Sequence, residues 1–213
     1  MICGMQDGNR VNYQRLLDRT LSEIAGDGRI PSLLLHACCA PCSSYVLEYL
    51  SKYFDITVFY YNPNISPKEE YDRRVAEITR LISQMPLARP AGLLPGKYEP
   101  ERFFAMAKGL ESVPEGGERC FACYRLRLLE TAKKAAEGGY DYFTTTLSIS
   151  PLKNADKLNS IGEEISDAYG VPYLYSDFKK KNGYKRSVEL SKEYDLYRQD
   201  YCGCVYSKKE RML

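Results

Sequence analysis

The sequence predicts an α/β protein built on a mainly parallel, twisted sheet with helices on both faces. Strand-like runs such as Ser32–His36 and Asp55–Tyr61 alternate with helix-like segments such as Lys68–Ser83, and this alternation is typical of βαβ units. The chain has 213 residues, 44% of them hydrophobic, which is enough for one domain with its own core. We therefore expect one α/β domain over residues 31–213, preceded by a helical extension over residues 1–30.

The first elements each have a local signal. Asn12 is a good helix cap, and leucine and isoleucine at helical spacing after it predict a helix to about Ala25. Ser32–His36 is an apolar run of strand length. Pro41 stands where the next helix would start, since proline lacks only an N–H group that the first turn leaves free. Asp55–Tyr61 is the second expected strand.

The helices and strands expected after Tyr61 are predicted from the same kinds of signal. Apolar residues recur at spacings of three and four in Lys68–Ser83, which predicts a strong helix. The segment 86–100 is rich in loop-forming residues and has room for one short strand. Further helices are expected over Pro100–Gly109, Glu118–Glu137, Asn154–Tyr169 and Ser187–Glu193, and further strands over Tyr140–Thr145 and Val171–Tyr175.

Eight cysteines are many for a chain of this kind. The sequence has no run of 18 apolar residues and no apolar segment near its N-terminus, so we expect no membrane span, no secretory signal and a cytoplasmic location. The cytosol keeps thiols reduced. The clustered cysteines are therefore predicted to be metal ligands or redox centres, while Cys3, which stands apart from the clusters, is expected to be a bystander.

The first cluster is Cys38, Cys39 and Cys42, in the stretch LLLHACCAPC. It follows a predicted strand directly and overlaps the start of a helix. In open parallel sheets, ligands bind beyond the carboxyl ends of the strands. The free N–H groups of a helix start favour thiolates and also an anionic metal cluster.

Cys120 and Cys123 lie three residues apart near a predicted helix start, so they share one helix face. Such a pair is half a site for zinc or for an iron–sulfur cluster. Together with the first cluster it predicts a four-thiolate site. A redox iron centre is favoured, because adjacent thiols are unlike the usual zinc-ribbon spacing. The alternative is a zinc-stabilised RNA-binding module without catalysis.

Cys202 and Cys204 form the third group, with one glycine between them. A disulfide across a single residue is strained and readily reduced, so the pair could store two electrons; metal binding explains it equally well. His36 is the only histidine. A lone histidine beside a strand is more often a core residue than a ligand, and a functional role for it is the less favoured reading.

The C-terminal segment is basic. From Asp177 onward, 10 lysine and arginine residues face 6 aspartate and glutamate residues, with tyrosines interleaved. Cations meet phosphates and aromatic rings stack on unpaired bases, so this composition suits a nucleic acid partner. On charge alone, a solvated face is the favoured explanation.

Five long motifs resemble one known family: HACCAPC, FYYNPNISPKEEYDRR, ERCFACYRLRL, DYFTTTLSISPLKN and DFKKKNGYKRSVELSKEYDLYRQDYCGC. They resemble the cobalamin-independent epoxyqueuosine reductases (QueH family), from about Leu33 to Arg211. The resemblance implies a Rossmann-like, HUP-type α/β domain. It implies reduction of the epoxide of epoxyqueuosine, at the wobble position of tRNA, to the alkene of queuosine, the last step of queuosine biosynthesis. It further implies a [4Fe-4S] cluster and a second, mononuclear iron.

The same resemblance implies roles for the thiols. The implied cluster ligands are Cys38, Cys39, Cys120 and Cys123. The implied redox-active pair is Cys202 and Cys204, and Cys42 is a candidate catalytic residue and ligand of the second iron. Any of Cys42, Cys202 and Cys204 could instead replace a member of the cluster set, so all seven thiols are candidate metal ligands.

The implied partners are the tRNA anticodon stem-loop and an external electron donor. Candidate phosphate contacts are Lys179, Lys180, Lys181, Lys185 and Arg186. Asp177 beside them is a candidate proton donor, with a plain surface carboxylate as the favoured reading. Residues 62–64 (Asn-Pro-Asn) either line the pocket or form a turn, and the turn is favoured.

Overall fold

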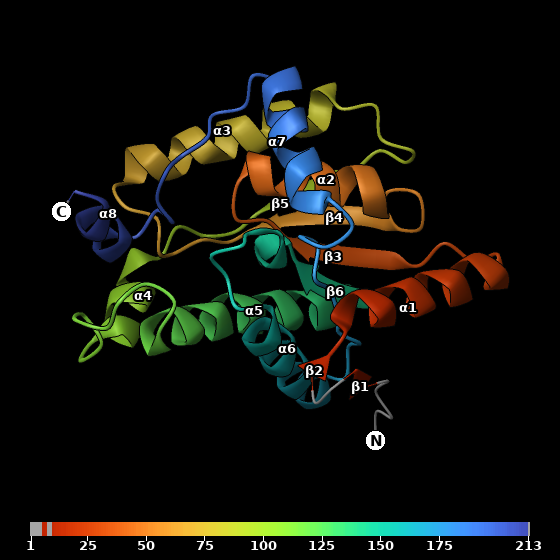
Figure 1. Ribbon diagram of the computed structural model, residues 1–213, viewed down its shortest axis with the longest axis horizontal. Coiled ribbons are helices and arrows are strands. Elements are labelled where there is room, and N and C mark those ends of the chain that lie inside the picture. The colour runs from red at the N-terminus through yellow and green to blue at the C-terminus, as the bar shows by residue number, and fades with distance from the viewer. Residues whose placement is uncertain (1–5, 8–9, 213) are drawn as a thin grey trace.

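The computed structural model describes residues 6–7 and 10–212 and contains a four-stranded, all-parallel sheet with the order β5-β4-β3-β6. Its strands are β3 (Ser32–His36), β4 (Asp55–Tyr60), β5 (Gly92–Pro95) and β6 (Tyr142–Thr145). The chain adds β4 and β5 on one side of β3 and then returns to place β6 on the other side. The strand order therefore reverses beside β3, and the expected α/β class is confirmed (Figure 1).

Helices occupy both faces of the sheet, with α2, α3 and α7 on one side and α5 and α6 on the other (Figure 1). A short 3-10 helix, η1, follows β6 and covers Thr146–Ile149. A small antiparallel hairpin joins β1 (Gln6–Asp7) to β2 (Arg10–Val11). The α-helices are α1 (Tyr13–Asp27), α2 (Ala40–Leu50), α3 (Lys68–Gln84), α4 (Pro100–Ala107), α5 (Glu118–Gly138), α6 (Ala155–Tyr169), α7 (Gly183–Glu193) and α8 (Val205–Arg211).

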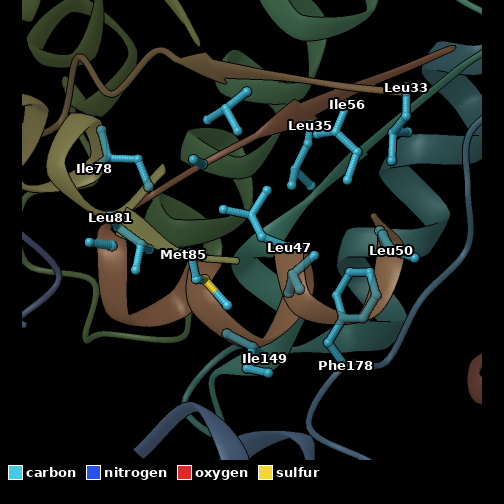
Figure 2. Packing of buried hydrophobic residues seen from close by; sticks show 14 of the residues in the cluster. Leu33, Leu35, Leu47, Leu50, Ile56, Ile78, Leu81, Met85, Ile149 and Phe178 are labelled. Atoms are coloured by element: carbon cyan, nitrogen blue, oxygen red, sulfur yellow. The ribbon is translucent and has the colours of Figure 1, made fainter. Parts of the chain in front are cut away.

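Side chains of β3 alternate between two cores, as the two-residue period of a strand requires. Leu33 and Leu35 face the core under α2 and α3, where Leu47 and Ile78 are fully buried. Figure 2 shows these side chains meeting between the strands and the helices. Leu34 faces the opposite core, formed with α5 and α6. Burying both faces of the central strand holds its carboxyl end in place.

Two predicted helix starts are confirmed. The Asn12 side chain caps α1 by accepting a hydrogen bond from the Arg15 amide at 3.1 Å. Asn154 caps α6 in the same way through the Lys157 amide. The apolar side of α1 packs into the core shared by α2 and α3. The division into an extension over residues 1–30 and a domain over residues 31–213 stays a prediction, and Cys3 lies outside the described residues.

Some expected elements differ from the structure. Residues Val171–Tyr175 do not form a strand: the segment makes a single bridge, between Phe143 and Tyr173. The nearby Pro172 offers a carbonyl but no N–H group, so a full ladder cannot form. Helix α7 begins at Gly183 instead of Ser187, α4 ends at Ala107 instead of Gly109, and neither α8 nor the β1–β2 hairpin was expected. None of the described helices combines the length and apolar character needed to cross a bilayer.

Candidate metal centre

The candidate site lies beyond the carboxyl ends of β3 and β6, where the strand order reverses. The connections that follow two neighbouring parallel strands run to opposite sides of the sheet here, and this leaves a crevice between them. Cys38 follows β3, and Thr146 follows β6. The Cys38 amide donates to Thr146 Oγ1 at 3.2 Å, and the Thr146 hydroxyl lies 3.4 Å from Cys38 Sγ. These two contacts join the ends of the strands across the crevice.

Cys38, Cys39 and Cys42 form the first thiol group, with their three Sγ atoms all within 4.8 Å of one another. Cys39 occupies the N-cap position of α2, and Cys42 lies in its first turn. The Cys38 and Cys39 sulfurs are 3.8 Å apart. A tetrahedral metal with sulfur ligands at about 2.3 Å places them about 3.8 Å apart, so the spacing suits a single metal ion.

The three thiols of this group share charge unequally. Hydrogen bonds from Cys38 and Cys42 hold the pKa of Cys39 well below its ordinary value. The same contact with Cys39 is the main cause that raises the pKa of Cys38 to about 11. Contacts with Cys38 and Cys39 raise the pKa of Cys42. Cys39 is therefore the thiol of this group that ionises most readily, and a soft metal cation would take the place of the protons that the three sulfurs share.

Cys120, Cys123, Cys202 and Cys204 form the second thiol group and line one small cavity. Cys120 and Cys123 lie at the start of α5, and Cys204 caps α8 by accepting from the Ser207 amide at 3.3 Å. Burial raises the pKa of Cys123 to about 12 and that of Cys204 to about 11. The fold therefore brings the C-terminal pair next to the Cys-x-x-Cys pair.

A larger cavity of about 290 Å³ joins the two groups, because Cys202 lines it together with the first thiol group. Three buried cations line the same cavity: Arg74, Arg127 and Lys153. All seven described cysteines are free thiols, and Cys202 and Cys204 form no disulfide. The structure therefore shows the predicted clustering of thiols but not the predicted disulfide. The cavity as a whole favours anions.

Lys153 and Glu115 tie the cysteine-bearing tail to the rest of the site. The Lys153 ammonium, 8% exposed, pairs with Glu115 at 2.9 Å. The other Glu115 oxygen accepts from the Ser207 hydroxyl at 3.0 Å, and the Cys202 amide donates to the same hydroxyl at 3.1 Å. A chain of polar contacts therefore fixes the position of Cys202.

Arg74 holds the same segment from the other side. Its Nε donates to Glu70 at 2.7 Å, and its Nη1 donates to the Cys202 carbonyl at 3.3 Å. Gly203 adopts a φ of +110°, and a Cβ there would lie 3.0 Å from Arg74 Nη1. The turn between the two C-terminal cysteines is therefore fitted closely around the Arg74 guanidinium.

Several of these residues were not predicted. Arg127 follows Cys123 by four positions in CFACYRLR, so it shares the thiol-bearing face of α5, and that spacing could have identified it. Arg74 lies in a helix that shows only an amphipathic pattern. Glu115 and Lys153 come from loops, and we find no local signal for either.

The remaining predicted residues lie around the site. His36 is fully buried and satisfied, with Nδ1 2.9 Å from Thr145 Oγ1 and Nε2 3.0 Å from the Tyr61 carbonyl. Burial lowers its pKa to about 4, so it is neutral and structural. Asn62 starts the expected turn, yet Asn64 also lines the cavity of the second thiol group.

The predicted phosphate contacts and Asp177 lie outside the two thiol-lined cavities. Asp177 is 8% exposed, pairs with Lys179 and lines a separate groove. Lys181 pairs with Asp18, and Arg186 pairs with Glu48. Lys180 and Lys185 are exposed, and no ion pair is recorded for either among the described residues.

The sequence is similar to known proteins of one family over most of its length. The family model described as "Epoxyqueuosine reductase QueH" matches residues 33–210. A protein of Streptococcus pyogenes with that name is 44% identical over 211 residues, which cover 98% of this chain and 83% of the relative. Its namesake in Staphylococcus epidermidis is also 44% identical, covering 97% and 88%. The Thermotoga maritima relative is 36% identical, covering 84% and 92%.

Proposed function

Because this chain belongs to the epoxyqueuosine reductase QueH family, and is on that ground an oxidoreductase acting on epoxyqueuosine, we propose that it works with an iron–sulfur cluster and a separate iron. Converting an epoxide to an alkene and water consumes two electrons and two protons. The observation that carries the proposal is the gathering of seven free thiols around one crevice. Four thiolates suffice for one cluster, so the others are available for a second function.

The donor set fits an anionic centre. Thiolates are the ligands of iron–sulfur clusters, and the buried Nη2 atom of Arg127 has no hydrogen-bond partner among the described residues. When bound, the cluster would supply single electrons, and an iron ion would act as a Lewis acid toward the epoxide oxygen. The protein's own share is to bind the base in the 290 Å³ cavity, to hold the thiols in place and to supply positive charge from Arg74, Arg127 and Lys153.

The ligand set proposed from the sequence is Cys38, Cys39, Cys120 and Cys123, with Cys42 at the second iron and Cys202 and Cys204 as the redox-active pair. The 3.8 Å spacing of the Cys38 and Cys39 sulfurs supports a second allocation. In a cubane cluster, each thiolate binds a different iron. The sulfur atoms of two such thiolates therefore lie farther apart than those of two thiolates on one metal ion. In that allocation, the first thiol group holds the single iron and the second thiol group holds the cluster.

The proposed partner is the anticodon stem-loop of a tRNA carrying epoxyqueuosine, and an external donor supplies the electrons. The mouth of the 290 Å³ cavity supports this partner. Tyr184, which is 40% exposed, and Tyr201 line it together with Arg198 and Arg211. Rings and cations at a cavity mouth suit splayed bases and phosphates. With a tRNA substrate, the proposed site of action is the cytoplasm.

Among the proposed phosphate contacts, Lys180 and Lys185 have the best support, because Lys179, Lys181 and Arg186 are engaged with carboxylates. Reversing both charges, in Lys180→Glu with Lys185→Glu, is expected to weaken binding of the anticodon stem-loop and to reduce its salt dependence. Filter binding at several salt concentrations measures both effects. Unchanged binding would assign the contact to the cavity mouth.

The experiment that tests the function joins metal analysis to product analysis. Protein purified without oxygen is expected to hold about four irons and four acid-labile sulfides per chain, with one further iron. The same sample, given a chemical reductant and epoxyqueuosine-containing tRNA, is expected to yield queuosine on nucleoside analysis by mass spectrometry. One zinc without sulfide, and no product, would contradict the proposal and favour the zinc-stabilised RNA-binding module.

Exchange of single cysteines for serine separates the two ligand allocations. Cys120→Ser loses cluster iron in both allocations, so full iron retention in that variant contradicts both. Cys38→Ser decides between them: loss of the cluster, with its sulfide, supports the set proposed from the sequence. Loss of only one iron, with sulfide retained, supports a single iron on the first thiol group.

A further inference from the structure

Among the residues whose burial the structure describes, three arginines are almost fully buried: Arg74, Arg119 and Arg127, with exposures of 2%, 2% and 1%. Arg74 pairs with Glu70 at 2.7 Å, and Arg119 pairs with Glu210 at 3.0 Å. For Arg127, no carboxylate lies within ion-pair distance in the described part of the chain. It is thus a buried cation whose anionic partner is not a carboxylate.

The guanidinium of Arg127 is also underused as a hydrogen-bond donor. Its Nε donates to the Cys123 carbonyl at 3.2 Å, and its Nη1 donates to Asn62 Oδ1 at 3.4 Å. Both acceptors are neutral. Its Nη2 is buried and has no hydrogen-bond partner. A guanidinium offers five N–H donors, and burying one without an anion is strongly unfavourable. The missing anion must therefore come from groups that Arg127 faces.

Those groups are thiols. Arg127 lines the 290 Å³ cavity with the first thiol group and the smaller cavity with the second thiol group, so it stands in the wall between them. Tyr124, whose ring centroid lies 5.9 Å away, is the other close partner and adds only a cation–π contact.

We propose that Arg127 is the counterion of the thiolate–metal centre, a positioning residue that donates through Nη2 to its sulfur and makes the centre easier to reduce. This inference rests on the proposed function. A fixed positive charge stabilises the more negative, reduced state of a neighbouring redox centre. It also favours thiolate over thiol, and so strengthens metal binding. Arg74 and Arg119 each have a carboxylate partner that offsets part of their charge, so their effect on the centre is weaker.

The test compares Arg127→Met with wild type and with Arg125→Met, which removes an arginine of the same helix that pairs with Glu164 and lines neither thiol-bearing cavity. At a fixed ambient potential, we expect the reduced-to-oxidised ratio of the centre in Arg127→Met to fall on the order of tenfold, a shift of about 59 mV for a one-electron couple. Spectroscopic redox titration of the reconstituted protein, without tRNA, measures it. Arg125→Met is expected to keep the wild-type potential.

Metal affinity gives a second readout that needs no iron. Competition with a chelator for Zn²⁺ is expected to show binding about tenfold weaker in Arg127→Met than in wild type, and Arg127→Lys is expected to recover most of the loss because it keeps the charge. If Arg127→Met does not fold, Arg127→Gln takes its place. Wild-type potential and wild-type Zn²⁺ affinity in a folded, charge-free variant would overturn the inference.

These outcomes are separate from a failure of the proposed function. Wild-type protein that binds no iron and sulfide contradicts the proposed cofactor, whereas the Zn²⁺ competition still decides the role of Arg127. Wild-type protein that holds its cluster and forms queuosine, with an unchanged potential and Zn²⁺ affinity in Arg127→Met, contradicts the role of Arg127 alone.

Discussion

Replacing Gly203 by alanine would show how closely the C-terminal thiol pair depends on its turn. Gly203 lies between Cys202 and Cys204 with a φ of +110°, outside the region that L-residues occupy readily. An added Cβ would lie 2.9 Å from Ile65 Cγ1 and 3.0 Å from Arg74 Nη1. Alanine must therefore either take a strained backbone or push the turn away from Arg74.

The cost can be estimated from two sources. A non-glycine residue held in such a backbone region costs about 1–3 kcal/mol, and overpacking of a filled site adds about 1–3 kcal/mol. We expect Gly203→Ala to lower the free energy of unfolding by about 3 kcal/mol. Because relief of the clash moves Cys202 and Cys204, metal content and queuosine formation should fall further than stability alone explains.

Gly139→Ala is the matched control. Gly139 has a φ of +66° at the end of α5, and an added Cβ would meet no atom within 4 Å. Its expected cost is about 1 kcal/mol, from the backbone alone, with normal metal content. Urea unfolding, iron analysis and the tRNA assay would be run on both variants. A Gly203→Ala protein that matches Gly139→Ala in all three measurements would refute the steric reasoning.

Two further predictions concern buried or hydrogen-bonded carboxylates. Glu115→Gln leaves the Lys153 charge buried without its partner, so we expect the free energy of unfolding in urea to fall by about 3 kcal/mol. The control, Glu164→Gln, breaks an exposed pair and should lower it by less than about 1 kcal/mol. Equal effects of the two substitutions would contradict the reasoning. Asp141 accepts from the Ser32 amide at 2.8 Å, a contact that lowers its pKa. The stabilisation of the fold by this ionised carboxylate is present above the ordinary carboxyl pKa and is lost as pH falls through the lowered pKa. Asp141→Ala should therefore lower the free energy of unfolding by about 1 kcal/mol at pH 7 and by progressively less below pH 4. A cost independent of pH would argue against the ionised carboxylate as the acceptor.

Much of the local structure could be read from the sequence because it depends on neighbouring residues. Helical spacing of apolar residues predicted α3, and a cap at Asn12 predicted the start of α1. The segment Val171–Tyr175 has strand composition, but Pro172 leaves it with a single bridge. Strand formation also depends on hydrogen bonds to a neighbouring strand, and the composition of a segment does not show which strand it will meet.

The sequence by itself determined the α/β class, the position of the first thiol group at the end of a central strand, and the supply of thiols for a metal centre. Only the tertiary structure decided which thiols meet. Cys202 and Cys204 approach Cys120 and Cys123 because α8 and the Glu115 loop are tied together through Ser207. The burial of Arg127 without a carboxylate is likewise a tertiary fact. Such long-range contacts arise from packing and charge compensation among distant segments, for which local periodicity holds no signal.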